Sequence, residues 1–309
     1  MKVLVYGAGI IGSYLTHVLL RGGHDVTILA RGKRAEELER NGIVLQHYFQ
    51  YKTTVDRIYV IRTLEADQEY DLIFVTMKYT DYPSVLPILA GNLSRNIVFV
   101  GNNTDIPAMQ KQKYIQDHSL MPKNIAFGFQ LCAGWRENER MVILRGKVKM
   151  MLGGAVGQVS FKPLLDQVFS KTKFKLAYHN DIDAWLKCHI IPILMLSSGG
   201  LAKNGRMNEV AKDKKLLRQM ITAMDEGFSV LEALGYTITP ANQVRLIRRH
   251  KRILHYMLKM YHLLPIAKMM QNSFGEMVAL NRDFDDWKKK SNIPTPHWDL
   301  LEKQFISET

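Results

Sequence analysis

The first residues that could do chemistry are three glycines near the start of the chain. They stand in Gly7-Ala8-Gly9-Ile10-Ile11-Gly12, directly after the apolar run from Lys2 to Tyr6. In a dinucleotide-binding turn, the first glycine permits a tight bend, the second lets the backbone approach a pyrophosphate, and the third lets helix and strand pack closely. The following helix would point its N-terminal N–H groups at the phosphates. Because this GxGxxG lies between a predicted strand and a predicted helix, it indicates a cofactor-binding loop rather than a purely structural turn.

The residues after the second predicted strand, Asp25 to Ala30, bear on which dinucleotide would bind. NAD-binding folds usually carry Asp or Glu there for the ribose 2′-hydroxyl, whereas NADP-binding folds often carry Arg. This chain reads Arg31-Gly32-Lys33-Arg34, with no acid before Glu36. Arg31 could clamp a 2′-phosphate, with Lys33 or Arg34 assisting, because a guanidinium matches phosphate geometry. The pattern predicts NADPH; the alternative is that these are solvated loop charges.

Alternating strands and helices must position this loop. After the first strand and the glycine turn, the apolar spacing predicts helices and strands in alternation through the first half of the chain. The further elements are a helix over Ser13–Arg21, a helix over Arg34–Arg40, strands over Asp71–Met77 and Asn96–Val100, and more strands within 127–153. Such alternation predicts an α/β fold, a Rossmann doubly wound parallel sheet covered on both faces.

The second half of the chain has helical spacing instead. Beyond about residue 173 the apolar pattern predicts helices near 181–200, 208–234, 240–260 and 262–290. We therefore expect an NADPH-binding Rossmann domain over 1–173 and an all-helical domain over 174–309 for substrate binding and dimerisation. Pro192 is expected to kink or interrupt the first of these helices.

Composition restricts the class of protein. The 309 residues suffice for two packed domains, and 47% are hydrophobic. Cys132 and Cys188 are too few for a disulfide framework and do not have a metal-ligand spacing. The start lacks the features of a signal peptide, and no uninterrupted apolar run reaches the roughly 18 residues of a membrane span. We expect a cytoplasmic protein with no metal site and no membrane contact.

The formal charge of +13 allows for an anionic partner. One basic cluster runs from Arg245 to Arg252, and its simplest interpretation is a solvated helix face. Excess positive charge can also attract nucleic acid, but no nucleic-acid-binding motif accompanies the cluster. We expect no nucleic-acid partner and keep a nucleic-acid-associated protein only as the weakest of three hypotheses.

Several segments, taken in order, resemble the ketopantoate reductase (2-dehydropantoate 2-reductase) family, and the resemblance runs nearly from end to end. The segments are Gly7 to Gly12, Gly22-Gly23-His24-Asp25-Val26-Thr27, Asp71-Leu72-Ile73-Phe74-Val75-Thr76-Met77-Lys78, Val100-Gly101-Asn102-Asn103, Trp185-Leu186-Lys187, Glu226 to Gly235, Gly275-Glu276-Met277-Val278-Ala279-Leu280-Asn281 and Ile293-Pro294-Thr295-Pro296. The resemblance implies NADPH-dependent reduction of a 2-keto acid, in the family ketopantoate to pantoate in pantothenate biosynthesis. The resemblance is compatible with a homodimer.

The resemblance also implies roles for single residues. Lys187 would protonate the developing alkoxide, and Glu276 would hydrogen-bond to the cofactor or orient that lysine. Lys78 would contact the cofactor, Asn102 would offer its amide near the nicotinamide, and Asn204 would match a substrate-binding asparagine. Without the resemblance, Lys187 would be interpreted as a surface lysine and Glu276 as an exposed helical glutamate. Lys78 would be interpreted as a solvated residue at a strand end, and Asn102 as a turn former.

The departures from the family pattern concern the substrate. Two asparagines four and eight positions after the family lysine are Ile191 and Met195 here, and a serine that contacts the substrate carboxylate is Leu264. Loss of hydrogen-bond partners should change which substrate is accepted. The main hypothesis is an NADPH-dependent reductase with an altered substrate shell. The alternative is a non-catalytic NADPH-binding or redox-sensing protein on the same scaffold.

Overall fold

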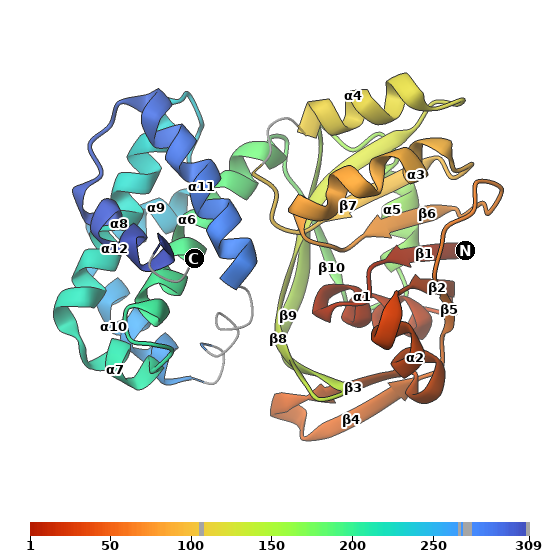
Figure 1. Cartoon of the computed structure of the whole chain (residues 1–309), viewed down its shortest axis with the longest axis horizontal. Coiled ribbons are helices and arrows are strands. Elements are labelled where there is room, and N and C mark those ends of the chain that lie inside the picture. Colours follow the sequence, from red (N-terminus) through yellow and green to blue (C-terminus); the bar gives the residue numbers. More distant parts are fainter. Residues whose placement is uncertain (105–107, 265–266, 268–273, 307–309) are drawn as a thin grey trace. The chain divides into compact units, whose positions relative to one another are not determined.

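The computed structural model describes residues 1–104, 108–264, 267 and 274–306 (Figure 1). The chain divides into two compact units, Met1–Ile182 and Asp183–Thr309. Unit 1 is built on a sheet with helices on it, and unit 2 is helical. The predicted α/β fold with a helical C-terminal part is therefore confirmed. Unit 1 includes β10 (Lys175–Tyr178), which follows residue 173 and pairs with a strand of the sheet.

The parallel part of the sheet carries the glycine-rich turn. Its strands are β1 (Lys2–Tyr6), β2 (Asp25–Leu29), β5 (Tyr59–Ile61), β6 (Leu72–Val75), β7 (Asn96–Val100) and β8 (Asn124–Glu137). They lie in the order β5-β2-β1-β6-β7-β8, and each neighbouring pair is parallel. This is the Rossmann order, in which the chain reverses direction across the sheet between β1 and β6. All four residues of β6 are buried, as a strand covered on both faces requires.

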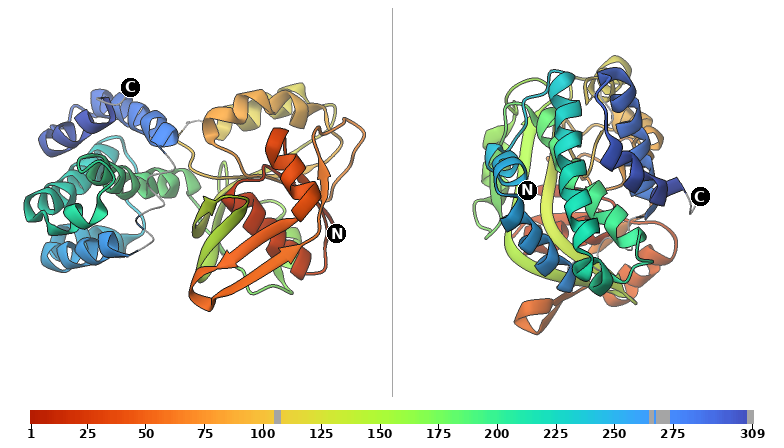
Figure 2. Two further views of the ribbon diagram at one scale, coloured as in Figure 1. Left: turned by 60° about the horizontal axis from the view of Figure 1, so that its bottom comes forward. Right: turned by 90° about the vertical axis from the view of Figure 1, so that its left-hand side faces the viewer.

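The other strands extend the sheet in a way that the sequence analysis did not predict. β9 (Arg140–Gly154) pairs antiparallel with β8 and parallel with both β10 and β3 (Ile43–His47). β3 forms an antiparallel hairpin with β4 (Lys52–Asp56) at the end of the strand order (Figure 2). Within the described part of the chain the sheet is thus ten-stranded and mixed, and the predicted parallel sheet is its central portion.

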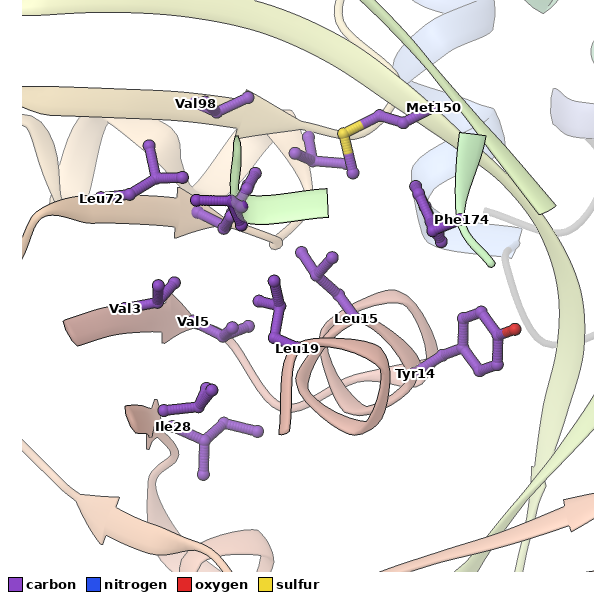
Figure 3. Close-up of a cluster of buried hydrophobic side chains, with 14 of the residues drawn as sticks. Val3, Val5, Tyr14, Leu15, Leu19, Ile28, Leu72, Val98, Met150 and Phe174 are labelled. Atoms are coloured by element: carbon purple, nitrogen blue, oxygen red, sulfur yellow. The ribbon is translucent and has the colours of Figure 1, made fainter. Parts of the chain in front are cut away.

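Helices cover both faces of the sheet. On one face, α1 (Ile10–Arg21) points Leu15 and Leu19 toward Val5 and its neighbours on the strands (Figure 3). Side chains of α2 (Gly32–Asn41) and α5 (Lys162–Phe169) join the same buried cluster. On the other face, Tyr82 lies 4.9 Å from Phe99, between ring centroids. Tyr82 belongs to η2 (Tyr79–Ser84), which is followed in the chain by α3 (Leu86–Gly91) and, after β7, by α4 (Ala108–His118). A further short helix, η1 (Tyr48–Gln50), follows β3.

Unit 2 consists of helices. They are α6 (Ile182–Leu201), α7 (Met207–Lys212), α8 (Lys214–Ala233), α9 (Ala241–Arg249), α10 (Lys251–Leu263), α11 (Phe274–Ser291) and α12 (Pro296–Ile306). The helix predicted over 208–234 is two helices, because the Asp213 carboxylate accepts the Leu216 N–H at 2.9 Å and caps a new start. The helix predicted over 240–260 also divides, at His250. The expected interruption at Pro192 was wrong, since α6 continues through it.

A glycine brings three helices of unit 2 together. A Cβ atom built on Gly227 of α8 would lie 2.9 Å from Ile191 of α6 and 2.8 Å from Trp298 of α12. Trp298 also contacts Phe284 of α11, with ring centroids 3.8 Å apart. Helix α6 is long and apolar enough to cross a membrane by length and composition, but 72% of the relevant stretch is buried. Its apolarity is that of a core helix.

Candidate functional site

The first and last glycines of the glycine-rich loop after β1 pack against backbone atoms, whereas the middle glycine faces open space. Gly7 has φ +118°, and a Cβ there would lie 2.6 Å from the Thr76 carbonyl oxygen. A Cβ on Gly12 would lie 2.0 Å from the Gly7 carbonyl oxygen, so both positions exclude a side chain. A Cβ on Gly9 would meet no heavy atom within 4 Å. The middle of the loop therefore faces open space, where a ligand could approach the backbone.

Thr76, at the end of β6, holds this loop in place. Its hydroxyl donates to the Gly7 carbonyl at 2.9 Å, and its N–H donates to the Tyr6 carbonyl at 2.8 Å. Helix α1 begins directly after Gly9, which provides no side-chain cap for the first N–H groups. Those N–H groups therefore face the N-terminal side of α1, which favours an anion.

Arg31 immediately precedes α2 and lies two residues beyond the end of β2. Its side chain is exposed, and so is that of Lys33. Burial raises the pKa of Tyr6, the last residue of β1, and the positive charge of Arg31 partly offsets that rise. Arg31 thus lies close enough to the end of β1 for its charge to act there, and its guanidinium remains accessible to a ligand.

Arg34 has a different role from Arg31. Its guanidinium donates to the Ala8 carbonyl at 3.1 Å and to the Ser13 hydroxyl at 3.1 Å, and it pairs with Glu37 at 3.2 Å. Burial lowers the pKa of Arg34, and the hydrogen bond with Glu37 counteracts the effect. Arg34 is thus a brace that ties α2 to the glycine-rich loop.

The loops after β6 and β7 lie at the same edge of the sheet. A Cβ on Gly101 would lie 3.2 Å from the Met77 carbonyl oxygen, so the two loops pass close together. Lys78 is exposed and precedes η2, and Asn102 is 9% exposed. Because β2, β1, β6 and β7 are adjacent and parallel, Arg31, the glycine-rich loop, Lys78 and Asn102 all follow the carboxyl ends of neighbouring strands. Open α/β sheets bind their ligands at this edge.

Lys187 in unit 2 is a fully buried lysine with 0% of its surface exposed. Its ammonium forms an ion pair with Asp183, one turn earlier on α6, whose side chain is 27% exposed. The Nζ atom also lies 4.8 Å from the centroid of the Tyr236 ring and 5.6 Å from that of Trp287. A buried ammonium is costly unless it is paired, and the carboxylate and the two ring faces provide that compensation. Lys187 is therefore not a solvated surface lysine.

These partners of Lys187 are only partly visible in the sequence. Asp183 could have been found, because acid and lysine four positions apart face each other on a helix. Tyr236 and Trp287 gave no such sign, since they come from the segment after α8 and from α11. Nearby on α6, burial lowers the pKa of His189 to about 4. That imidazole is uncharged at neutral pH and cannot serve as a cationic proton donor.

The other predicted residues of unit 2, Glu276 and Asn204, belong to segments that follow α6 in the chain. Glu276 is half-buried in the first turn of α11, about 16 Å along that helix from Trp287 at 1.5 Å per residue. Asn204 is exposed with φ +50° beyond the far end of α6, and about 21 Å of helix separates that end from Lys187. Among the residues that the structure describes, no three His, Cys, Asp or Glu side chains gather to hold a metal ion.

The apolar residues that replace the family's polar residues are partly in the core of unit 2 and partly on its surface. Ile191 and Met195 are 0% exposed on α6, and Ile191 packs against Gly227 of α8. Leu264 is 50% exposed at the end of α10. The first two thus belong to the core of unit 2, where an asparagine would need a hydrogen-bond partner to be tolerated.

Comparison with known proteins gives a family. The sequence profile described as ketopantoate reductase PanE/ApbA matches residues 3–155. The chain belongs to the ketopantoate reductase family. A curated 2-dehydropantoate 2-reductase of Archaeoglobus fulgidus is similar over 257 residues at 24% identity, covering 79% of this chain and 78% of that protein.

Two further comparisons show how far the family likeness extends. An uncharacterized oxidoreductase of Bacillus subtilis is 51% identical over 45 residues, which is 15% of each chain. Among solved structures, a D-mandelate dehydrogenase with NADH and anilino(oxo)acetate has a TM-score of 0.76 at 14% identity, covering 99% of this chain and 98% of that one. At that identity the likeness concerns the fold.

Proposed function

We propose that the protein is an NADPH-dependent reductase of a 2-keto acid. The observation that carries the proposal is the buried ammonium of Lys187, held by Asp183 and faced by two aromatic rings. A positioned ammonium can both donate a proton and offset developing negative charge. Membership of the ketopantoate reductase family supports the same chemistry.

The loops of unit 1 fit a dinucleotide. The open space at Gly9 and the N–H groups at the start of α1 would accept the pyrophosphate. Lys78 and Asn102 would contact the cofactor from the neighbouring strand ends. When bound, the reduced nicotinamide supplies a hydride to the ketone carbon of the substrate.

Arg31 favours NADPH over NADH. A D-mandelate dehydrogenase of the same fold is described with NADH, so the fold alone does not choose. Here an exposed guanidinium stands where NAD-binding chains carry an acid, and Lys33 is exposed beside it. Arg34 is engaged with the loop and with Glu37, so we assign the 2′-phosphate to Arg31.

Lys187 would complete the reduction by protonating the alkoxide as it forms. Asp183 would hold the ammonium in place, and the two rings would restrict its directions. The product is a 2-hydroxy acid, so the reaction consumes one keto acid, one NADPH and one proton. Glu276 and Asn204 remain predicted contributors, orienting the lysine and binding substrate.

The substrate is proposed to differ from ketopantoate. The positions expected to hydrogen-bond a keto acid are Ile191, Met195 and Leu264, and the first two are core residues. These residues provide no hydrogen bond to a polar group of the substrate, which disfavours a substrate that depends on such bonds. The accepted 2-keto acid should therefore carry a less polar side chain than ketopantoate.

The test is steady-state oxidation of NADPH with a panel of 2-keto acids, from ketopantoate to branched and aromatic members. We expect turnover with apolar members to exceed turnover with ketopantoate. Tight NADPH binding without turnover of any carbonyl would contradict the reductase and support the non-catalytic alternative. Binding should be measured first, by titrating the protein into NADPH and following nicotinamide fluorescence.

A further inference from the structure

Helix α10 carries an apolar stripe on its exposed side. The stripe consists of Ile253, Tyr256, Met257, Met260, Leu263 and, just past the helix end, Leu264. These side chains are 47–68% exposed. Their spacing of three and four residues places them on one face, because an α-helix turns once in 3.6 residues.

The opposite face of α10 makes the packing contacts. Leu254, Leu258 and His262 are buried there, spaced four residues apart. The stripe is thus not the core-facing side of the helix. Contiguous exposed apolar surface of this kind marks a site of interaction with a partner or a membrane.

The stripe is bordered by positive charge. Arg252 and Lys259 are exposed and lie on the same edge of it, and Arg245 and Arg249 are exposed on the preceding helix α9. No Asp or Glu occurs in the sequence between Glu232 and Glu276. This part of the chain therefore has nothing of its own to neutralise these charges.

Neighbouring helices add to the positive field. Burial lowers the pKa of His255, on the inner edge of α10, and the charges of Arg218, Lys214 and Lys259 lower it further. Arg218 and Lys214 are exposed residues of α8.

The nearby acids are already paired. Asp225 and Glu232 bind Arg248, and Glu209 binds Arg206.

We propose that α10 binds an anionic lipid surface, lying in the interface with its stripe toward the acyl chains. An interfacial helix combines an apolar face with Lys and Arg at its border, and a tyrosine suits the headgroup level. Each basic residue near an anionic surface adds to the attraction. No membrane-spanning segment is needed for such binding.

Two other occupants fit less well. If the stripes of two copies of the chain paired, Arg252 and Lys259 of one copy would approach the same residues of the other copy. No Asp or Glu on α9 or α10 would neutralise these charges. A nucleic acid would use the basic residues but would leave the apolar stripe without a partner.

The experiment is flotation of the full chain with vesicles of phosphatidylcholine, with or without about 30 mol % phosphatidylserine. The wild type should float only with the anionic vesicles, and about 0.5 M salt should release it, because salt screens the attraction. Absence of flotation with anionic vesicles overturns the proposal.

Variants separate the stripe from the charges. Met257→Glu with Met260→Glu should reduce partitioning by about tenfold or more, because carboxylates would enter the apolar boundary. Arg252→Gln with Lys259→Gln should reduce it several-fold and weaken its salt dependence. The matched control is Leu120→Glu, at a residue 97% exposed in unit 1, which should float like the wild type. Thermal melting should be unchanged in all three, since the substituted side chains are exposed.

Three further results would contradict binding of α10 to an anionic lipid surface. Partitioning that survives Met257→Glu with Met260→Glu overturns the proposal. So does a dimer in sedimentation velocity that this double variant converts to monomer while no vesicle is bound. Binding of duplex DNA without binding of anionic vesicles would equally overturn it.

Discussion

The glycine-rich loop of unit 1 and the surroundings of Lys187 in unit 2 are built on opposite principles. The loop is made by six consecutive residues and one hydroxyl, and Gly7 and Gly12 are required because a Cβ there would overlap backbone atoms. The surroundings of Lys187 are assembled from α6, from Tyr236 and from α11. The first depends on local backbone geometry and the second on long-range packing. Substitutions in the loop should therefore act mainly through backbone geometry, and substitutions around Lys187 mainly through the position of its ammonium.

The two regions also treat charge differently. Arg31 is exposed and available to a ligand, whereas Lys187 is buried and compensated within the protein. Removing the exposed charge should weaken ligand binding alone. Removing the buried one should eliminate a proton donor and leave Asp183, which is partly exposed and can be hydrated.

The largest expected effect follows Lys187→Met. The rate of keto-acid reduction should fall about 100- to 10,000-fold, the range that a general acid contributes. NADPH affinity should be unchanged, because the proposed cofactor residues lie in unit 1. Stopped-flow oxidation of NADPH and a binding titration measure the two quantities. Lys212→Met, at an exposed lysine of α7, is the control, and an equal loss there would contradict a specific role for Lys187.

The next effect tests the loop as a unit of backbone geometry. Gly12→Ala should destabilise the protein by about 3 kcal/mol, because its Cβ would overlap the Gly7 carbonyl. Gly9→Ala should leave the melting temperature of the ligand-free protein unchanged and weaken NADPH binding, since its Cβ would enter open space. Calorimetry with and without NADPH distinguishes them. Equal destabilisation by the two variants would show that the loop is not open at its middle.

A smaller effect is expected at Arg31. Arg31→Ala should weaken NADPH binding by about 2 kcal/mol, roughly 30-fold, because it removes a charge-assisted hydrogen bond to the 2′-phosphate. NADH affinity should not change. Lys33→Ala, two residues on, should have a weaker effect and serves as the control. Equal affinities of the wild type for NADH and NADPH, unaltered in Arg31→Ala, would defeat the proposed clamp.

The smallest effect concerns a second buried charge group in unit 2. Burial raises the pKa of Glu302 from 4.5 to about 7, although Lys288 and Asn281 hold its carboxylate oxygens. Between these two pKa values the folded protein binds more protons than the unfolded chain, so this contribution to stability falls as pH rises through that window. The loss should be at most about 2 kcal/mol between pH 5 and pH 7.5, measured by thermal melting. Glu302→Gln should flatten it, and an unchanged pH dependence would assign the effect elsewhere.

The fold was largely predictable because its signals are local. The strands over Lys2–Tyr6 and Asn96–Val100 have the predicted bounds, and alternation along the first half implied the parallel order. The breaks at Asp213 and His250 were missed, since a cap between two apolar-periodic segments does not disturb their periodicity. The long β8–β9 hairpin and its partners β3 and β10 were also missed, because strand partners distant in sequence leave no local pattern.

The glycine-rich loop, the basic end of β2 and the family resemblance could be identified from residue types at fixed short spacings. The packing of the chain was needed to show that Arg34 braces the loop, that Ile191 and Met195 belong to a core, and that Lys187 is buried near Tyr236 and Trp287. The tertiary structure also exposed the apolar side of α10, which periodicity alone would assign to the core. The physical reason is the same in each case. A helical pattern specifies a face, and only the packing of distant segments specifies what that face meets.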